Sequence, residues 1–147
     1  MGSSARRGRL STSPDAKAAY TEPTASDRND AHPATLGRAL AYIDEHADKP
    51  ITPAGIAAAA HVTIRSLQYA FRRHLNTTPL AHLRRVRLSR AHEELLEADP
   101  FSDTTVMDIA TRWGFFHMGR FAALYRDTYG RTPRLALADK NEGQKTL

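Results

Sequence analysis

The basic side chains of this protein are distributed unevenly along its sequence. Arginine accounts for 17 of the 21 basic residues. Between Lys49 and His92 the chain contains no Asp or Glu, although the protein has 16 acidic residues. Seven arginines lie in this acid-free window: Arg65, Arg72, Arg73, Arg84, Arg85, Arg87 and Arg90. An exposed helix surface normally mixes both signs of charge, so one sign over two predicted helices indicates contact with a polyanion. The guanidinium fork suits phosphate and guanine edges, which favours nucleic acid.

Other kinds of chemistry find little support in the residues. The chain has no Cys, and no two of its seven His residues have the i, i+4 spacing of a helical metal site. It has no nucleophile with an adjacent base, no Gly-rich phosphate loop and no carboxylate pair in a plausible pocket. We therefore expect no enzyme activity, no metal and no cofactor.

The bulk properties fit a DNA-associated protein. The formal net charge is +5 and the isoelectric point is about 9.9. No apolar run has the length of a signal peptide core or of a membrane span. These features predict a cytoplasmic protein, associated with the nucleoid through DNA and not with a membrane.

One long helix is expected to organise the elements that carry these residues. Thr78 and Pro79 provide a cap and a first helical residue, and Pro100 ends the helix, which predicts a helix over residues 79–98. Its apolar residues form two patches on different faces. The first patch is Leu80, Leu83 and Val86, and the second is Leu88, Ala91 and Leu95. A helix of this kind can link two small units, one at each patch.

The unit before the linker helix has the pattern of a helix-turn-helix. A helix over residues 37–46 precedes a short helix over 53–60, a turn at His61 and Val62, and a second helix capped by Thr63. The buried stripe of that second helix is predicted to contain Leu67, Ala70, Phe71 and either His74 or Leu75. Its exposed, donor-rich residues are Arg65, Gln68, Tyr69, Arg72 and Arg73. Such side chains are typical of a recognition helix in the major groove.

The unit after the linker helix repeats this plan at a distance of about 54 residues. Thr104 or Thr105 caps a helix with Val106, Ile109, Ala110 and Trp113 on its buried side, and Gly114 provides the turn. A second helix over residues 116–129 ends at Gly130, and a short helix follows over 134–138. We expect Trp113 and Phe115 to be core residues, and Asp108 and Arg112 to form a surface pair.

The boundaries of these units follow from composition. Residues 1–36 are polar and aperiodic, which predicts a disordered tail or linker. Residues 37–138 form the domain, with units at about 37–77 and 101–138, and residues 139–147 form a frayed tail. The fold class is therefore all-α, with two helix-turn-helix subdomains joined by a long linker helix.

In its motifs the sequence resembles the DNA-binding domain of the AraC/XylS family of bacterial transcription regulators. The resemblance covers residues 36–137 and rests on the segments 56–73, 78–88 and 109–115, on Gly119 to Arg126, and on Tyr129, Gly130 and Pro133. It implies about seven helices, with two recognition helices in successive major grooves of double-stranded DNA. By position it implies base contacts from Arg65, Gln68 and Tyr69 in the first unit, and from His117, Met118, Gly119, Arg120 and Ala123 in the second. It implies phosphate contacts from Thr63, Arg72, Arg73 and Arg126.

The sequence departs from the family pattern in both recognition helices. Tyr69 occupies a position where many members have Arg. Gly119 and Ala123 have no polar reach, so the second recognition helix depends on Arg120 and His117. The family usually carries a separate effector or dimerisation domain, so this chain is either a compact regulator or the C-terminal part of a longer one.

The resemblance also implies partners. The family leans towards activation, which implies RNA polymerase as a second partner beside DNA. An alternative is a helical co-regulator that binds polymerase or an acidic protein. Such a module would carry an exposed aliphatic patch in place of Arg65, Gln68, Tyr69 and Arg120.

Overall fold

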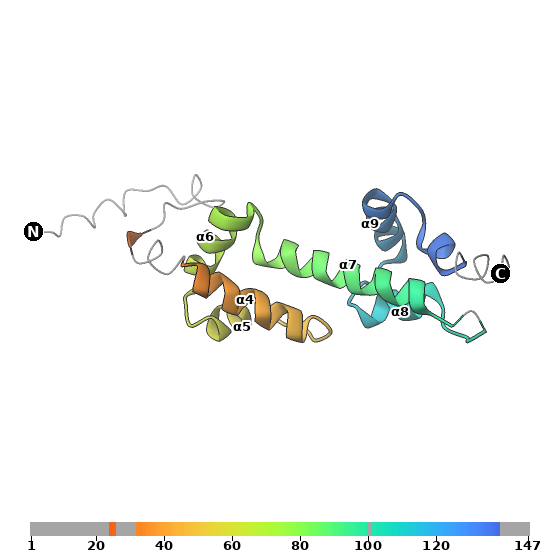
Figure 1. Cartoon of the computed structure of the whole chain (residues 1–147), viewed down its shortest axis with the longest axis horizontal. Helices are drawn as coiled ribbons and strands as arrows, with labels where there is room; N and C mark the ends of the chain where they lie inside the picture. The colour runs from red at the N-terminus through yellow and green to blue at the C-terminus, as the bar shows by residue number, and fades with distance from the viewer. Residues whose placement is uncertain (1–23, 26–31, 100, 139–147) are drawn as a thin grey trace, which may run out of the picture.

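The computed structural model describes residues 24–25, 32–99 and 101–138. Between residues 32 and 138 the described chain is all-helical, which confirms the predicted fold class. Seven helices occur in this range: α4 (Pro33–His46), α5 (Pro53–Ala59), α6 (Ile64–Leu75), α7 (Pro79–Glu97), α8 (Val106–Arg112), α9 (Met118–Tyr129) and a short helix over residues 133–138. Figure 1 shows α7 as a long rod with one group of helices near each end.

Local capping chemistry sets most helix boundaries. Thr52, Thr63, Thr78 and Thr105 each precede a helix, and each hydroxyl accepts a hydrogen bond of 3.0–3.1 Å from the backbone N–H three residues later. Proline occupies the first turn of α4, α5 and α7, where no helical donor is lost. Asn76 and Gly130 end α6 and α9 with φ values of 53° and 79°, the left-handed geometry of a helix C-terminus.

The helices bury two separate cores, one near each end of α7. The first core combines α4, α5 and α6 with Leu83 of α7. The second combines α8, α9 and the 133–138 helix with Leu88, Ala91 and Leu95 of α7. The two-patch interpretation of the linker helix is therefore confirmed, with one exception. Leu80 is 47% exposed and does not join the first core.

The first helix begins earlier than predicted. α4 starts at Pro33, because His32 caps it through Nδ1 and Pro33 is well suited to the first helical position. Thr35 and Leu36 are buried. The predicted end of the N-terminal tail at residue 36 was therefore wrong, and the domain begins at the cap of α4. The rest of the predicted tail, except residues 24–25, and the predicted tail over 139–147 lie outside the described residues.

Three local predictions also need correction. His74 and Leu75 are both exposed, because the buried stripe of α6 ends at Phe71 one turn before the left-handed Asn76. The second recognition helix starts after His117 and not at Phe116. Asp108 does not pair with Arg112, because its carboxylate accepts from Thr105 N in a capping box. Within the described range, no helix combines the length and apolarity that crossing a membrane needs.

Candidate nucleic-acid interface

The solvent-facing side of α6 carries the side chains predicted for the first recognition helix. Leu67, Ala70 and Phe71 fix its opposite side in the first core. Gln68, Arg72 and Arg73 are exposed, and Arg65 and Tyr69 are half-buried. On a helical wheel these five residues fall away from the buried stripe, so α6 presents a surface of long hydrogen-bond donors.

Thr63 already uses its hydroxyl group within the protein. The Oγ1 atom accepts from Ser66 N at 3.0 Å and donates to Ser66 Oγ at 3.1 Å. The phosphate contact predicted for Thr63 therefore has no hydroxyl proton to use unless this pair rearranges.

The solvent-facing side of α9 is much less polar at its centre. Phe121 and Tyr125 are buried, and the residues on the opposite side are Gly119, Arg120, Ala123 and Arg126, all exposed. A Cβ atom added at Gly119 would meet only the His117 ring, at 3.5 Å, so packing within the protein does not require glycine there. The backbone of α9 can therefore approach another molecule closely at this point.

At the N-terminus of α9, His117 caps the helix and Met118 packs against the second core. His117 is exposed and accepts from Arg120 N through Nδ1 at 3.2 Å, so a neutral ring carries its proton on Nε2. That proton is a donor at the N-terminal end of the helix. Met118 is half-buried and packs against the second core, so its side chain is less available for the base contact that was predicted for it.

The two recognition helices occupy the same side of α7. In Figure 1, α6 and α9 both lie above α7, whereas α4, α5 and α8 lie below it. α7 has 19 residues, which at 1.5 Å per residue gives a rod about 28 Å long, along which both units pack. The helices that carry the predicted site residues thus lie on the same side of α7, near its opposite ends. α6 carries Arg65, Gln68, Tyr69, Arg72 and Arg73, and α9 with its cap carries His117, Arg120 and Arg126.

Two arginines of the acid-free window are half-buried and donate to groups of the protein itself. Arg87 donates through Nε to Ala47 O at 2.8 Å and through Nη2 to Lys49 O at 2.6 Å. Arg90 donates through Nη2 to the carbonyl oxygen of Asp44 at 3.0 Å and to its Oδ1 at 2.7 Å. Carbonyls at the C-terminal end of α4 attract cations. The interpretation of this one-sign surface as a contact for a polyanion therefore does not extend to these two residues, which were not among the predicted phosphate contacts.

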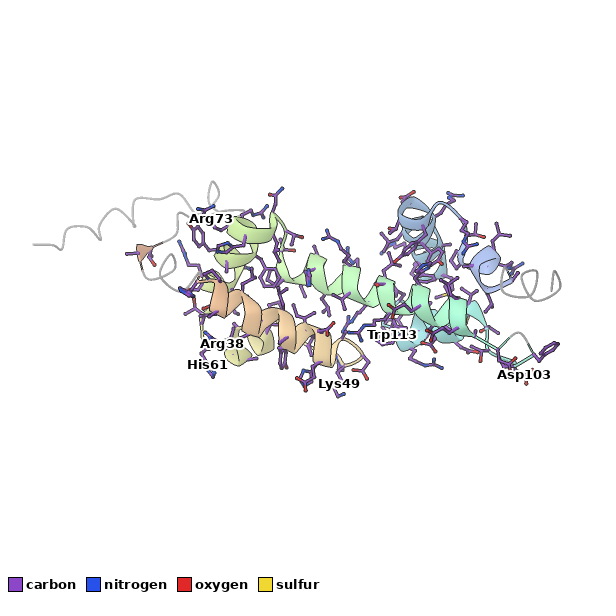
Figure 2. All side chains as sticks on the ribbon, in the orientation of Figure 1. Arg38, Lys49, His61, Arg73, Asp103 and Trp113 are labelled. Carbon is purple, nitrogen blue, oxygen red and sulfur yellow. The ribbon has the colours of Figure 1, made fainter. Side chains whose placement is uncertain are left out.

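Trp113 completes this contact between the two units. Its ring packs against both cores, and Nε1 donates to Glu94 Oε1 at 2.7 Å. Glu94 also forms an ion pair with Arg112, and the Arg90 guanidinium lies 5.9 Å from the centre of the Trp113 ring. In Figure 2, Trp113 lies between the two groups of helices. We call this set the inter-unit junction: Asp44, Arg87, Arg90, Glu94, Arg112 and Trp113.

The junction was not predicted from the sequence, apart from the burial of Trp113. The residues that form its hydrogen bonds and ion pairs lie 18 to 46 residues apart in the sequence. The one available signal is Glu94, which stands just after the acid-free window and has Arg90 one turn before it.

The histidines of α7 have structural surroundings. His92 Nδ1 lies 2.6 Å from Tyr125 Oη, and its ring stacks on Tyr129 at 3.8 Å. His82 meets the edge of Phe71 at 5.8 Å. Burial lowers the pKa of both histidines, and Arg85 near His82 and Arg131 near His92 lower it further. Among the described residues no group of three His, Asp or Glu side chains is placed to hold a metal ion.

The fold and this surface define a class of protein. Two helix-turn-helix units, fixed to one linker helix with both second helices on the same side, form a tandem helix-turn-helix DNA-binding domain. A family profile described as "Helix-turn-helix domain" matches residues 56–138. The chain belongs to the AraC/XylS family of transcriptional regulators.

Several known proteins resemble the chain over this domain. The "Probable thc operon regulatory protein" of Rhodococcus erythropolis is 44% identical over 101 residues, which cover 69% of this chain and 30% of that protein. The "XylDLEGF operon transcriptional activator 1" of Pseudomonas putida is 35% identical over 97 residues, covering 65% of this chain and 29% of that protein. The crystal structure of a probable AraC family transcriptional regulator from Rhodopseudomonas palustris CGA009 has a TM-score of 0.66 and 33% identity, covering 72% of this chain and 96% of that one. The match thus spans about a third of the length of the two curated relatives.

Proposed function

We propose that this chain binds double-stranded DNA in a sequence-specific way, with α6 and α9 in successive major grooves. The observation that carries this proposal is the placement of two exposed second helices on one side of a rigid linker of about 28 Å. Successive major-groove faces on one side of B-DNA lie about 34 Å apart. The length of α7 is of the same order as that repeat, which supports the proposal.

The side chains on this surface divide into two roles in the proposal. Arg65, Gln68 and Tyr69 on α6, and His117 and Arg120 on α9, contact base edges. Arg72, Arg73 and Arg126, which are exposed one or more turns further along their helices, contact phosphate. Arg pairs with the two acceptors of guanine and Gln with the two groups of adenine, so Arg65, Gln68 and Arg120 supply most of the base specificity.

The surface also argues against the alternative of a protein-binding co-regulator. Between Arg65 and Arg73 the exposed residues of α6 are long donors, and the two exposed apolar side chains of this helix, Ile64 and Leu75, lie at its ends. A helix that docks on a protein groove presents apolar anchors at i, i+3 and i+4. The donors on α6 suit groove edges and phosphates better.

A salt series on selected DNA tests the proposal. A duplex selected from a random pool should bind more tightly than a scrambled duplex of the same length. Three phosphate contacts give a slope of log K against log[salt] of about −3, since each contact contributes about −0.9. A slope shallower than about −1, or equal affinity for both duplexes, would contradict the proposal.

Two variants make the test specific to this surface. Arg73→Ala should weaken binding to every sequence and reduce the slope by about 0.9. Lys49→Ala is the charge-matched control, because Lys49 is exposed on the opposite side of the molecule from Arg73 in Figure 2. Equal effects of the two variants would mean that only net charge attracts the DNA.

The regulatory role of the whole protein extends this proposal. The names of the R. erythropolis and P. putida relatives describe an operon regulator and a transcriptional activator. We propose that this chain is the DNA-binding part of a regulator of the same kind and that it contacts RNA polymerase when it activates. Transcription in vitro from a promoter with the selected site, with and without the chain, tests this extension.

A further inference from the structure

The turn of the second helix-turn-helix contains one more residue than the turn of the first. In both units the turn starts identically: Val62 N donates to Ala57 O at 3.0 Å, and Phe115 N donates to Ala110 O at 2.9 Å. The residue before each of these has positive φ, 63° at His61 and 87° at Gly114. After Val62 the next residue is the cap Thr63, whereas Phe116 stands between Phe115 and the cap His117.

The inserted residue is a large aromatic side chain in contact with water. Phe116 is 79% exposed, and the neighbouring Phe115 packs against the second core. A phenyl ring held in water gains nothing for folding. Its position directly before the N-terminal cap of α9 places it at the end of the recognition helix from which major-groove contacts are usually made.

Small apolar residues also occupy the centre of the exposed α9 surface. Gly119 and Ala123 are exposed on the side of the helix opposite Phe121, and Arg120 and Arg126 flank them. Phe and Ala are side chains that contact the thymine 5-methyl group in the major groove. The small residues let α9 lie close to the base edges, within reach of a ring at the helix start.

We infer that Phe116 contacts the 5-methyl group of a thymine in the second half-site, so that α9 recognises DNA partly through apolar contact. The inference rests on the proposed function and deepens it, since it assigns a base preference to a position that has no polar side chain. It also explains how a helix with Gly119 and Ala123 at its centre adds specificity beyond Arg120.

A double-mutant cycle with modified DNA tests the inference. Deoxyuridine differs from thymidine only by the missing 5-methyl group. Each thymine in the second half-site of the selected duplex is replaced in turn, and each duplex is titrated with the complete wild-type chain and with Phe116→Ala. At one position the wild type should lose about fourfold in affinity, the value of one buried carbon at about 0.8 kcal/mol. Compared with the wild type, Phe116→Ala should lose a similar factor in affinity for the thymine duplex. Replacing the thymine at that position by deoxyuridine should cause no further loss of affinity for Phe116→Ala.

The matched control is Phe101→Ala. Phe101 is 89% exposed in the segment between α7 and α8, so the same substitution removes the same ring from another exposed place. Phe101→Ala should bind as wild type does and keep the fourfold deoxyuridine effect. Because Phe116 is exposed, Phe116→Ala should retain the thermal midpoint of the wild type, which separates a lost contact from lost folding.

The possible outcomes separate the inference from the proposed function. Coupling between Phe116 and one methyl group supports the inference. Specific binding by the wild type without coupling at any thymine, or a second half-site without thymine, overturns the inference and leaves the proposed function intact. Unchanged DNA affinity of Phe116→Ala overturns it too, and points to a protein partner for the ring. Failure of the wild type to prefer the selected duplex overturns the proposed function itself.

Discussion

Replacement of Trp113 should loosen the relative placement of the two helix-turn-helix units. The ring packs against both cores and donates to Glu94 at 2.7 Å, so it links the units in addition to α7. Trp113→Phe keeps an aromatic ring and removes the hydrogen bond. Its cost is about 1 kcal/mol, below the usual range for a bond to a charged group, because Glu94 keeps its ion pair with Arg112.

Trp113→Ala removes the packing as well. Aromatic-to-alanine changes in a full core cost about 3–5 kcal/mol, so a half-buried ring is expected to cost about 2–3 kcal/mol. For a domain of this size about 1 kcal/mol lowers the thermal midpoint by about 4 °C. Thermal unfolding should therefore show a decrease of about 4 °C for Trp113→Phe and of about 8–12 °C for Trp113→Ala.

The decisive assay measures the spacing of the half-sites. One inserted base pair moves the second half-site by about 3.4 Å and rotates it by about 34°. A rigid protein loses a base contact in the second unit, a penalty of about tenfold. Trp113→Ala should bind the original duplex less tightly and reduce the insertion penalty to about threefold, whereas Trp113→Phe should keep most of it.

Leu95→Ala is the matched control for loss of stability. Leu95 is buried in the second core and not in the first, so its truncation should cost about 2–5 kcal/mol without opening the junction. This variant should retain the full insertion penalty. If Trp113→Ala also retains it, the two patches of α7 alone fix the spacing, and the role assigned to the junction is wrong.

Three further predictions concern single residues. Arg120→Ala should nearly abolish the base preference at one base pair of the second half-site, at a cost of about 1–3 kcal/mol on the best site. If Arg120→Ala instead weakens binding equally for all bases, as expected of Arg73→Ala, Arg120 contacts phosphate. Gly119→Ala should raise the thermal midpoint, since alanine favours helix by about 1 kcal/mol, and yet weaken DNA binding; unchanged affinity would mean that α9 does not approach DNA there. Burial lowers the pKa of His82 and His92 in the folded protein, so the unfolded chain binds more protons than the folded one. The free energy of unfolding should therefore fall as the pH drops from about 7 through about 6.5. A flat pH profile in urea titrations would contradict this.

The elements of the fold could be predicted because their signals are local. Thr52, Thr63 and Thr78 lie beside the helices that they cap, and the hydrogen bonds that they accept span three residues. The two apolar patches of α7 follow from helical periodicity alone, and each became part of a different core. The start of α4 was missed because a histidine cap is a weaker signal than a threonine cap, although Pro33 directly follows it.

The roles of the arginines could be predicted only in part. The exposure of Arg72 and Arg73 follows from their place on α6, opposite the stripe with Leu67. The positions of Arg87 and Arg90 on α7 carry no comparable signal, because their partners, backbone carbonyls and the Asp44 carboxylate, lie 38 to 46 residues away. A stretch without acidic residues predicts arginines with unneutralised charge only where no backbone carbonyls accept from them. The charge pattern does not show where the C-terminus of another helix will lie.

The junction and the α9 surface together account for an asymmetry between the two units. In the proposed complex, Arg65, Gln68 and Arg72 of α6 contact DNA through charge and hydrogen bonds. Gly119 and Ala123 of α9 take the places of Arg65 and Tyr69, so the proposed contacts of α9 are shorter in reach and depend more on shape. Contacts of that kind are lost when the helix is misplaced by a few ångströms, whereas long arginines adapt to such a shift. In this proposal the second unit therefore gains most from a rigid connection, and Trp113, whose ring makes that connection, belongs to the second unit.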